Sequence, residues 1–159
     1  MYKIFITFQS FLLIVLFSAG LSFGANGMVN VKSAHSVTET ANRLEAILKK
    51  KGLNVFARID HAAGASKIGA ELRPTELIVF GNPKVGTPLM QCQQSVAIDL
   101  PQKALIWQDE SSQVWFSYND PQYLADRHGI KGCDEVIRKI QNALSKLAAA
   151  SCKAEDKEE

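Results

Sequence analysis

Hydrophobic and polar positions alternate along the chain in blocks that predict strands and helices in turn. Residues 53–60 (LNVFARID) alternate with the period of two that is typical of a half-buried strand. Residues 77–80 (LIVF) are apolar without a break, which predicts an interior strand covered on both faces. Gly81-Asn82-Pro83 follows, and this turn chemistry predicts that the strand ends in a polar, glycine-rich loop reaching to about Pro88.

Apolar spacings of three and four residues predict amphipathic helices towards both ends of the chain. The first is expected after a Ser36–Glu39 capping box and before Gly52, which is a natural residue to follow a helix. The second is expected around residues 136–147. Shorter helices are predicted over residues 62–72, over 89–93 and between Pro121 and Gly129.

The remaining strand patterns lead to a fold class. Extended segments are predicted at residues 28–34 and 96–100, and a hairpin is predicted from residues 103–108 and 113–118. Helices and strands interleave, but some neighbouring strands are joined by a hairpin. We therefore predict a two-layer α+β fold, with one mixed β-sheet and helices packed mainly on one face.

The first residues have the organisation of a secretory leader. Lys3 is followed by an apolar core at residues 11–17, and Ser22 and Gly24 are small residues suited to a cleavage site. We predict a signal peptide over residues 1–24, a single domain over 25–150 and a charged, disordered tail over 151–159. An uncleaved anchor is the alternative, but the apolar stretch is shorter than the roughly 20 residues that a span requires.

This organisation predicts a periplasmic or secreted protein with no stable membrane insertion after the leader is removed. The formal net charge of the 159 residues is only +2, which gives no electrostatic case for binding nucleic acid.

Three cysteines would then meet an oxidising compartment. Cys133 and Cys152 are expected at opposite ends of one helix, roughly 28 Å apart, so they cannot pair with each other. Cys92 can pair with only one of them, so an odd thiol remains or bridges two chains. We favour Cys92 as a small buried side chain and Cys133 as the more exposed thiol, near a helix N-terminus.

Polar side chains gather at the ends of predicted elements around the central loop, and they define a candidate ligand-binding set: His61, Asn82, Lys84, Thr87, Arg127 and His128. The set suits a small anion, a metal or a cofactor. A nucleotide-hydrolysing loop is excluded, because the glycine-rich segment lacks its lysine and Pro83 removes a backbone donor.

The cofactor stays unknown, because no paired-cysteine zinc pattern and no haem attachment motif occurs. Two histidines from distant stretches, His61 and His128, could still meet and bind a metal or haem iron together with Met90 or Cys92.

Catalysis is the alternative to binding. The candidates are three nucleophiles, two bases and two orienting acids: Thr87, Ser95 or Cys92; His61 or His128; and Asp60 or Asp99. No recognised catalytic motif such as G-x-S-x-G is present, so we favour a binding module over an enzyme. A structural or partner-binding dimer without chemistry is the third hypothesis.

Several separated motifs resemble one family. Residues 58–90, 98–107, 118–121 (YNDP) and 127–130 (RHGI) resemble, in order, the family called domain of unknown function 302. The resemblance implies a small two-layer α/β domain that forms a homodimer, and it implies no established activity. The leader and the cysteines are not part of the family pattern.

Overall fold

A computed structural model describes residues 22–24 and 27–154 of the chain. The strands are β1 (Ser22–Gly24), β2 (Met28–Ser33), β3 (Asn54–Asp60), β4 (Thr75–Gly81), β5 (Gln102–Gln108) and β6 (Val114–Asn119). The α-helices are α1 (Val37–Lys50), α2 (His61–Ser66), α3 (Pro83–Cys92), α4 (Pro121–His128) and α5 (Asp134–Cys152), and a 3₁₀ helix, η1, spans Gln94–Ile98.

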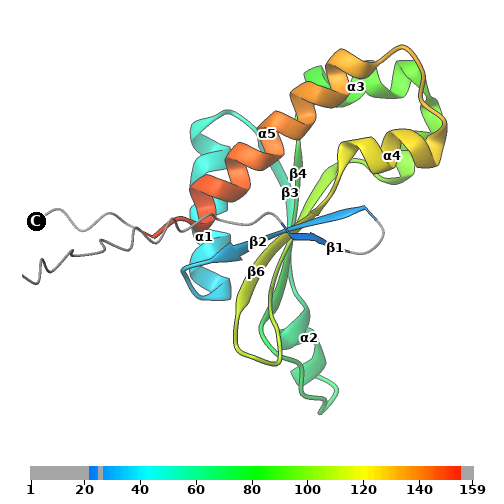
Figure 1. The fold of residues 1–159 in the computed structure, drawn as a ribbon. Coiled ribbons are helices and arrows are strands. Elements are labelled where there is room, and N and C mark those ends of the chain that lie inside the picture. Colours follow the sequence, from blue (N-terminus) through cyan, green and yellow to red (C-terminus); the bar gives the residue numbers. More distant parts are fainter. Residues whose placement is uncertain (1–21, 25–26, 155–159) are drawn as a thin grey trace, which may run out of the picture.

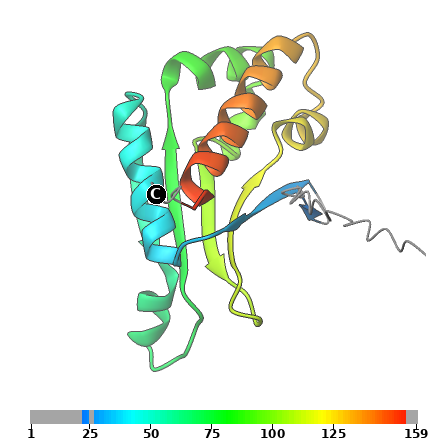
Figure 2. The same ribbon diagram turned by 60° about the vertical axis from the view of Figure 1, so that its left-hand side comes forward.

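The strands form one sheet in the order β1-β2-β6-β5-β4-β3, and the long helices α1 and α5 lie together on one of its faces (Figures 1 and 2). The predicted two-layer α+β fold is therefore confirmed. In detail, every described strand pair is antiparallel, so the sheet is not mixed as we expected.

The core lies between this sheet face and the two helices. Ile78, Ile106 and Phe116 are fully buried on the sheet side, and Leu44 and Leu144 meet them from α1 and α5. Burial of these apolar side chains is the main source of the fold's stability.

β4 is an interior strand, but the prediction that both of its faces are covered is wrong. Burial alternates along it: Glu76, Ile78 and Phe80 are buried under the helices, whereas Leu77 and Val79 on the other face are only partly buried. The cause is the layering, because α1 and α5 cover a single face of the sheet.

Four further expectations need correction. The segment after Gly81 is not a loop, because α3 begins directly at Pro83 and includes residues 89–92 of the helix predicted over 89–93. Residues 96–100 are not extended and belong largely to η1. The helix predicted over 62–72 is only His61–Ser66. Ser151 and Cys152 are the buried end of α5, not the start of a disordered tail.

The predicted start of one helix and the predicted end of another are confirmed. The Ser36 hydroxyl accepts a hydrogen bond from the Glu39 backbone N–H at 3.2 Å and starts α1. Gly129 ends α4 with φ +62°, a left-handed conformation that favours glycine.

The two ends of the chain are described only in part. Most of the predicted leader, residues 1–21, and the last residues of the predicted tail, 155–159, lie outside the described residues. Ser22–Gly24, the last three residues of the predicted leader, form β1 and pair with β2. Cleavage after Gly24 would therefore leave β2 as the outer strand at that edge of the sheet.

The predicted hairpin of β5 and β6 is confirmed, and Asp109 organises its turn. One carboxylate oxygen of Asp109 accepts hydrogen bonds from the backbone N–H groups of Ser111 and Gln113, both at 2.9 Å. The other accepts from the Trp115 indole N–H at 2.7 Å. The bond from Trp115 foremost, then one from the Ser111 hydroxyl at 2.7 Å and the two backbone bonds lower the pKa of Asp109 to about 2.

We expect Asp109→Asn to cost stability at neutral pH but little at pH 2. A carboxyl whose pKa is lowered by folding contributes stability above its unfolded pKa, and that stability is lost as the pH falls through the folded pKa. For Asp109 the loss falls between about pH 4 and about pH 2. Thermal melts across this range should show the difference from wild type shrinking, with Glu110→Gln as the matched control. A difference that is constant with pH would contradict the assignment.

Candidate functional site

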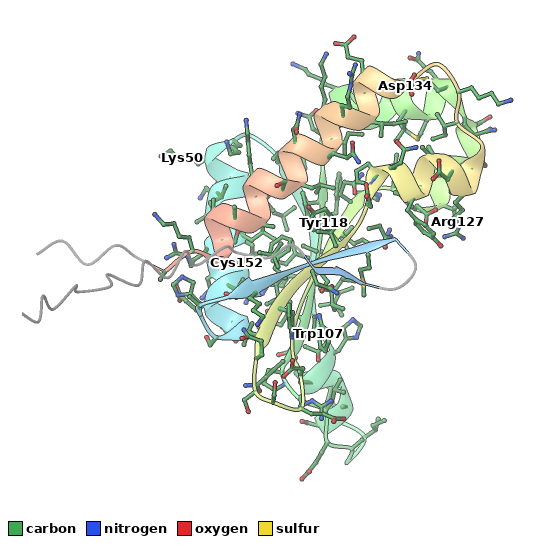
Figure 3. The ribbon with its side chains drawn as sticks, in the orientation of Figure 1. Lys50, Trp107, Tyr118, Arg127, Asp134 and Cys152 are labelled. Carbon is green, nitrogen blue, oxygen red and sulfur yellow. A yellow bond between two sulfur atoms is a disulfide. The ribbon has the colours of Figure 1, made fainter. Side chains whose placement is uncertain are left out.

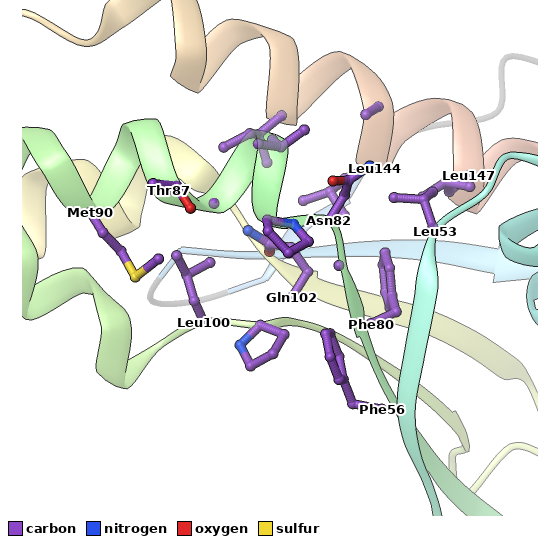
Figure 4. A pocket seen from close by; sticks show the side chains of 17 residues that line it. Leu53, Phe56, Phe80, Asn82, Thr87, Met90, Leu100, Gln102, Leu144 and Leu147 are labelled. Carbon is purple, nitrogen blue, oxygen red and sulfur yellow. The ribbon is translucent and has the colours of Figure 1, made fainter.

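A cavity of about 310 Å³ lies between α5 and one end of the sheet. Its walls are apolar apart from Asn82, Thr87 and Gln102 (Figure 4). Figure 4 shows Met90 and Leu100 at one end, and Leu147, Leu53, Phe80 and Phe56 at the other. The arrangement suits a small ligand with an apolar body and a hydrogen-bonding group.

Four separated segments of the chain form the cavity, because the end of β4 continues directly into α3. The sheet contributes the start of β3 and the end of β4, α3 forms a side wall, and α5 closes the cavity with Ile140, Leu144 and Leu147. The turn into β5, where the Leu100–Pro101 peptide is cis, forms the remaining wall. Asn82 also caps α3, because its side-chain oxygen accepts from the Lys84 backbone N–H at 2.9 Å.

Only two members of the predicted ligand-binding set line this cavity: Asn82 and Thr87. Lys84 is exposed in the first turn of α3 and does not line it. His61 lies at the far end of the sheet, because β3 and β4 are antiparallel and Asp60 pairs with Glu76, whereas Asn54 pairs with Gly81. The length of β4 separates His61 from Asn82 by roughly 20 Å.

Arg127 and His128 form a second group at the end of α4, away from α2 and His61 (Figure 3 shows Arg127 beside α4). The His128 Nε2 atom lies 2.6 Å from Asp99 Oδ2, and His128 Nδ1 lies 3.0 Å from Ser95 Oγ. Arg127 Nη1 donates to the other oxygen of Asp99 at 3.2 Å. The structure thus joins three of the predicted catalytic candidates in one hydrogen-bonded chain.

The cysteines are arranged differently from our expectation. Cys92, at the end of α3, and Cys133, which caps α5, form a disulfide. Cys133 is buried and Cys92 is exposed, so both predicted environments are wrong. Cys152 is a buried free thiol whose pKa is raised to about 11, first by burial, and such a thiol is unreactive.

Sequence reasoning missed a buried ionic group beneath α1. The Glu76 carboxylate accepts from Arg58 Nε at 2.6 Å and from the Thr38 hydroxyl at 3.0 Å. Arg58 also donates to Glu45 at 2.9 Å, and these bonds, the one to Glu76 foremost, raise the pKa of Arg58. The sequence contained one signal for this group: the period-two alternation of a strand places the acidic residue Glu76 of β4 on the face that the helices cover.

Residues 22–24 and 27–154 lack two features that would have indicated a function. They contain no helix long and apolar enough to cross a membrane. They also contain no cluster of three or more histidine, cysteine or acidic side chains that could hold a metal ion.

The antiparallel sheet covered on one face by two long helices defines a two-layer α+β domain. Comparison with known proteins identifies the family of this domain. The chain belongs to the family described as domain of unknown function DUF302, whose model matches residues 29–147. A crystal structure described as an uncharacterized conserved DUF302 protein from Bacillus stearothermophilus has the same fold. Its TM-score is 0.72 at 20% identity, and the match covers 81% of this chain and all of the other.

Closer relatives in sequence carry a functional name. Proteins named fluoride-specific ion channel FluC 1, from Brucella suis biovar 1 and Brucella abortus biovar 1, are 52% identical to this chain over 105 residues. The match covers 66% of this chain but only 41% and 39% of those proteins. The chain therefore spans about two fifths of the length of the curated relatives that it matches.

Proposed function

We propose that this protein is exported and binds a small, mainly apolar molecule in the cavity beneath α5. The observation that carries the proposal is the cavity itself, about 310 Å³ in volume and walled by apolar side chains with three polar groups. Ligand sites typically combine a pocket of this size with a few polar groups that fix the orientation of the ligand.

The distribution of polar groups suggests what the ligand looks like. Phe56, Phe80 and Leu147 offer contact to an apolar body at one end, whereas Asn82, Thr87 and Gln102 offer hydrogen bonds nearer the other (Figure 4). Amide and hydroxyl groups both donate and accept, so they suit a neutral or singly charged polar group such as a carboxyl, a hydroxyl or an amide.

Export is supported by the disulfide between Cys92 and Cys133, because disulfides persist in oxidising compartments and are rare in the cytosol. The predicted leader at residues 1–24 points the same way.

The name of the Brucella relatives raises the question of fluoride, but the cavity does not favour it. A small ion loses its hydration on entering an apolar cavity, which costs much free energy unless a charged partner compensates. Neither Lys84 nor Arg127 lines the cavity. We therefore propose a larger, apolar ligand.

We expect Ala143→Phe to weaken binding of the dye 1-anilinonaphthalene-8-sulfonate at least tenfold, because the new ring occupies the cavity that Ala143 lines. A tenfold change corresponds to about 1.4 kcal/mol. Ala149→Phe is the matched control, since Ala149 is exposed on the same helix outside the cavity. The measurement is a fluorescence titration, repeated with sodium fluoride as a competitor.

Fluoride should leave the bound dye in place. Equal binding by the two variants would show that the dye binds elsewhere and would contradict the proposal. Native mass spectrometry of protein from its own compartment would then identify a ligand that purifies with the wild type and is lost from Ala143→Phe.

A further inference from the structure

The hydrogen-bonded chain of Ser95, His128 and Asp99 lies outside the cavity and is not used by the proposed binding function. All three are polar, and the two inner ones are shielded: the side chains of His128 and Asp99 are 9% and 13% exposed. Ser95 at the outer end is exposed. A nucleophile open to solvent, with a shielded base and acid behind it, is the order in which hydrolytic triads are built.

In the neutral form that a general base requires, the contacts place the proton of His128 on one particular nitrogen. A carboxylate only accepts hydrogen bonds, so the bond of 2.6 Å to Asp99 places the proton on Nε2. The other nitrogen of the neutral ring, Nδ1, is then an acceptor, and the Ser95 hydroxyl donates to it at 3.0 Å. His128 is thereby oriented as a general base towards Ser95 Oγ.

Neighbouring residues hold this arrangement in place. Arg127 donates to the second oxygen of Asp99, so that both oxygens of this carboxylate are engaged. Gly129 ends α4 directly after His128, so that His128 is the last residue of the helix. Arg127 and Asp99 are positioning residues in this arrangement, because neither contacts the serine.

The surface beside Ser95 indicates the kind of substrate. Ser95 and Ile98 lie three residues apart in the 3₁₀ helix η1, and such residues share one side of a 3₁₀ helix. Ile98 is 75% exposed, which is unusual for an isoleucine. It offers an apolar contact for the acyl group of a molecule that approaches the Ser95 hydroxyl.

We propose that Ser95 is a nucleophile that hydrolyses small carboxylic esters with an apolar acyl group. Ser95 Oγ attacks the ester carbonyl carbon while its proton moves to His128 Nδ1. The bond to the alcohol oxygen breaks, and the alcohol leaves with that proton. Water then attacks the acyl group on Ser95, gives a proton to Nδ1 and releases the acid, and the proton returns to Ser95.

The test is covalent labelling of the whole chain with a fluorophosphonate, followed by peptide mass mapping. Attack by Ser95 Oγ forms an oxygen–phosphorus bond and displaces fluoride, leaving an adduct of known mass. We expect the adduct on Ser95, with Ser66, Ser111 and Ser112, which are also exposed, unlabelled as internal controls. His128→Gln should slow the labelling at least a hundredfold, the lower range for a general base.

A second readout is the release of p-nitrophenol from p-nitrophenyl acetate, which Ser95→Ala should abolish. The absence of an adduct on Ser95 in the wild-type chain overturns the proposal, whatever the variants do. Labelling that is equal at the four serines, or unchanged in a folded His128→Gln variant, also overturns it. The hydrogen bonds between Ser95, His128 and Asp99 would then serve only to hold α4 against η1. Dye binding in the cavity is independent of these results.

Discussion

Replacing the Cys92–Cys133 disulfide by Cys92→Ser and Cys133→Ala is expected to lower the free energy of unfolding by about 4 kcal/mol. The two cysteines are 41 residues apart in the chain, so the bond closes a long loop and restricts the unfolded ensemble. Alanine is chosen for the buried Cys133, and serine for the exposed Cys92, so that neither substitution adds an unpaired buried hydroxyl.

Urea denaturation of the oxidised wild type and of the double variant measures this difference. Wild type reduced with dithiothreitol is the control, and it should unfold at nearly the same urea concentration as the variant. A difference below about 1 kcal/mol would mean that the bond does not constrain the unfolded chain as loop closure predicts.

The same bond has a local consequence for the cavity. It joins the end of α3 to the residue that caps α5, and these two helices form two of the cavity walls. Loss of the bond would therefore loosen the proposed ligand site as well as the fold. In this way one covalent bond links the proposed binding function to the proposed oxidising compartment.

The sequence predicted local structure well where a single residue decides it. Ser36 and Gly129 act through their own backbone neighbours, and so they could be read directly. Gly81-Asn82-Pro83 was misread because the same residues suit a loop and a helix start. Asparagine caps helices, and proline is favoured at their first position.

The site was harder to predict because it depends on which segments meet. The cavity takes its walls from four separated segments, and no spacing in the sequence reports their distances. The position of His61 could have been inferred from the sequence. In consecutive antiparallel strands the end of β3 lies beside the start of β4, and therefore away from Asn82. The contacts of Ser95, Asp99 and His128 depend on η1 packing against α4, and no sequence motif predicts this packing.

Export, a homodimer and the identity of the ligand stay predictions. The homodimer is the one for which the fold supplies a reason: the sheet face opposite α1 and α5 carries the apolar side chains of Leu77, Leu105 and Trp107, each only partly buried. A second copy of the chain would cover them.

Arg58→Met should lower the free energy of unfolding by about 3 kcal/mol, although Arg58 lies on the outer strand of the sheet. The reason is Glu76, whose side chain is 7% exposed and whose carboxylate would lose its cationic partner. The Thr38 hydroxyl would remain as its hydrogen-bond donor, and a single neutral donor does not compensate a buried charge.

The double variant Arg58→Met, Glu76→Leu separates the cost of an unpaired, buried Glu76 charge from the loss of the Arg58–Glu76 ion pair itself. A buried ion pair replaced by apolar residues of similar volume often leaves stability unchanged, so the double variant should recover most of the loss. Both variants are compared with wild type by urea denaturation. If Glu76→Leu failed to rescue Arg58→Met, the contacts of Arg58 with Asn42 and Glu45 would carry the stability instead, and the buried carboxylate would not. Rescue would show that Glu76 is a charge the fold tolerates only because Arg58 reaches it from the sheet edge.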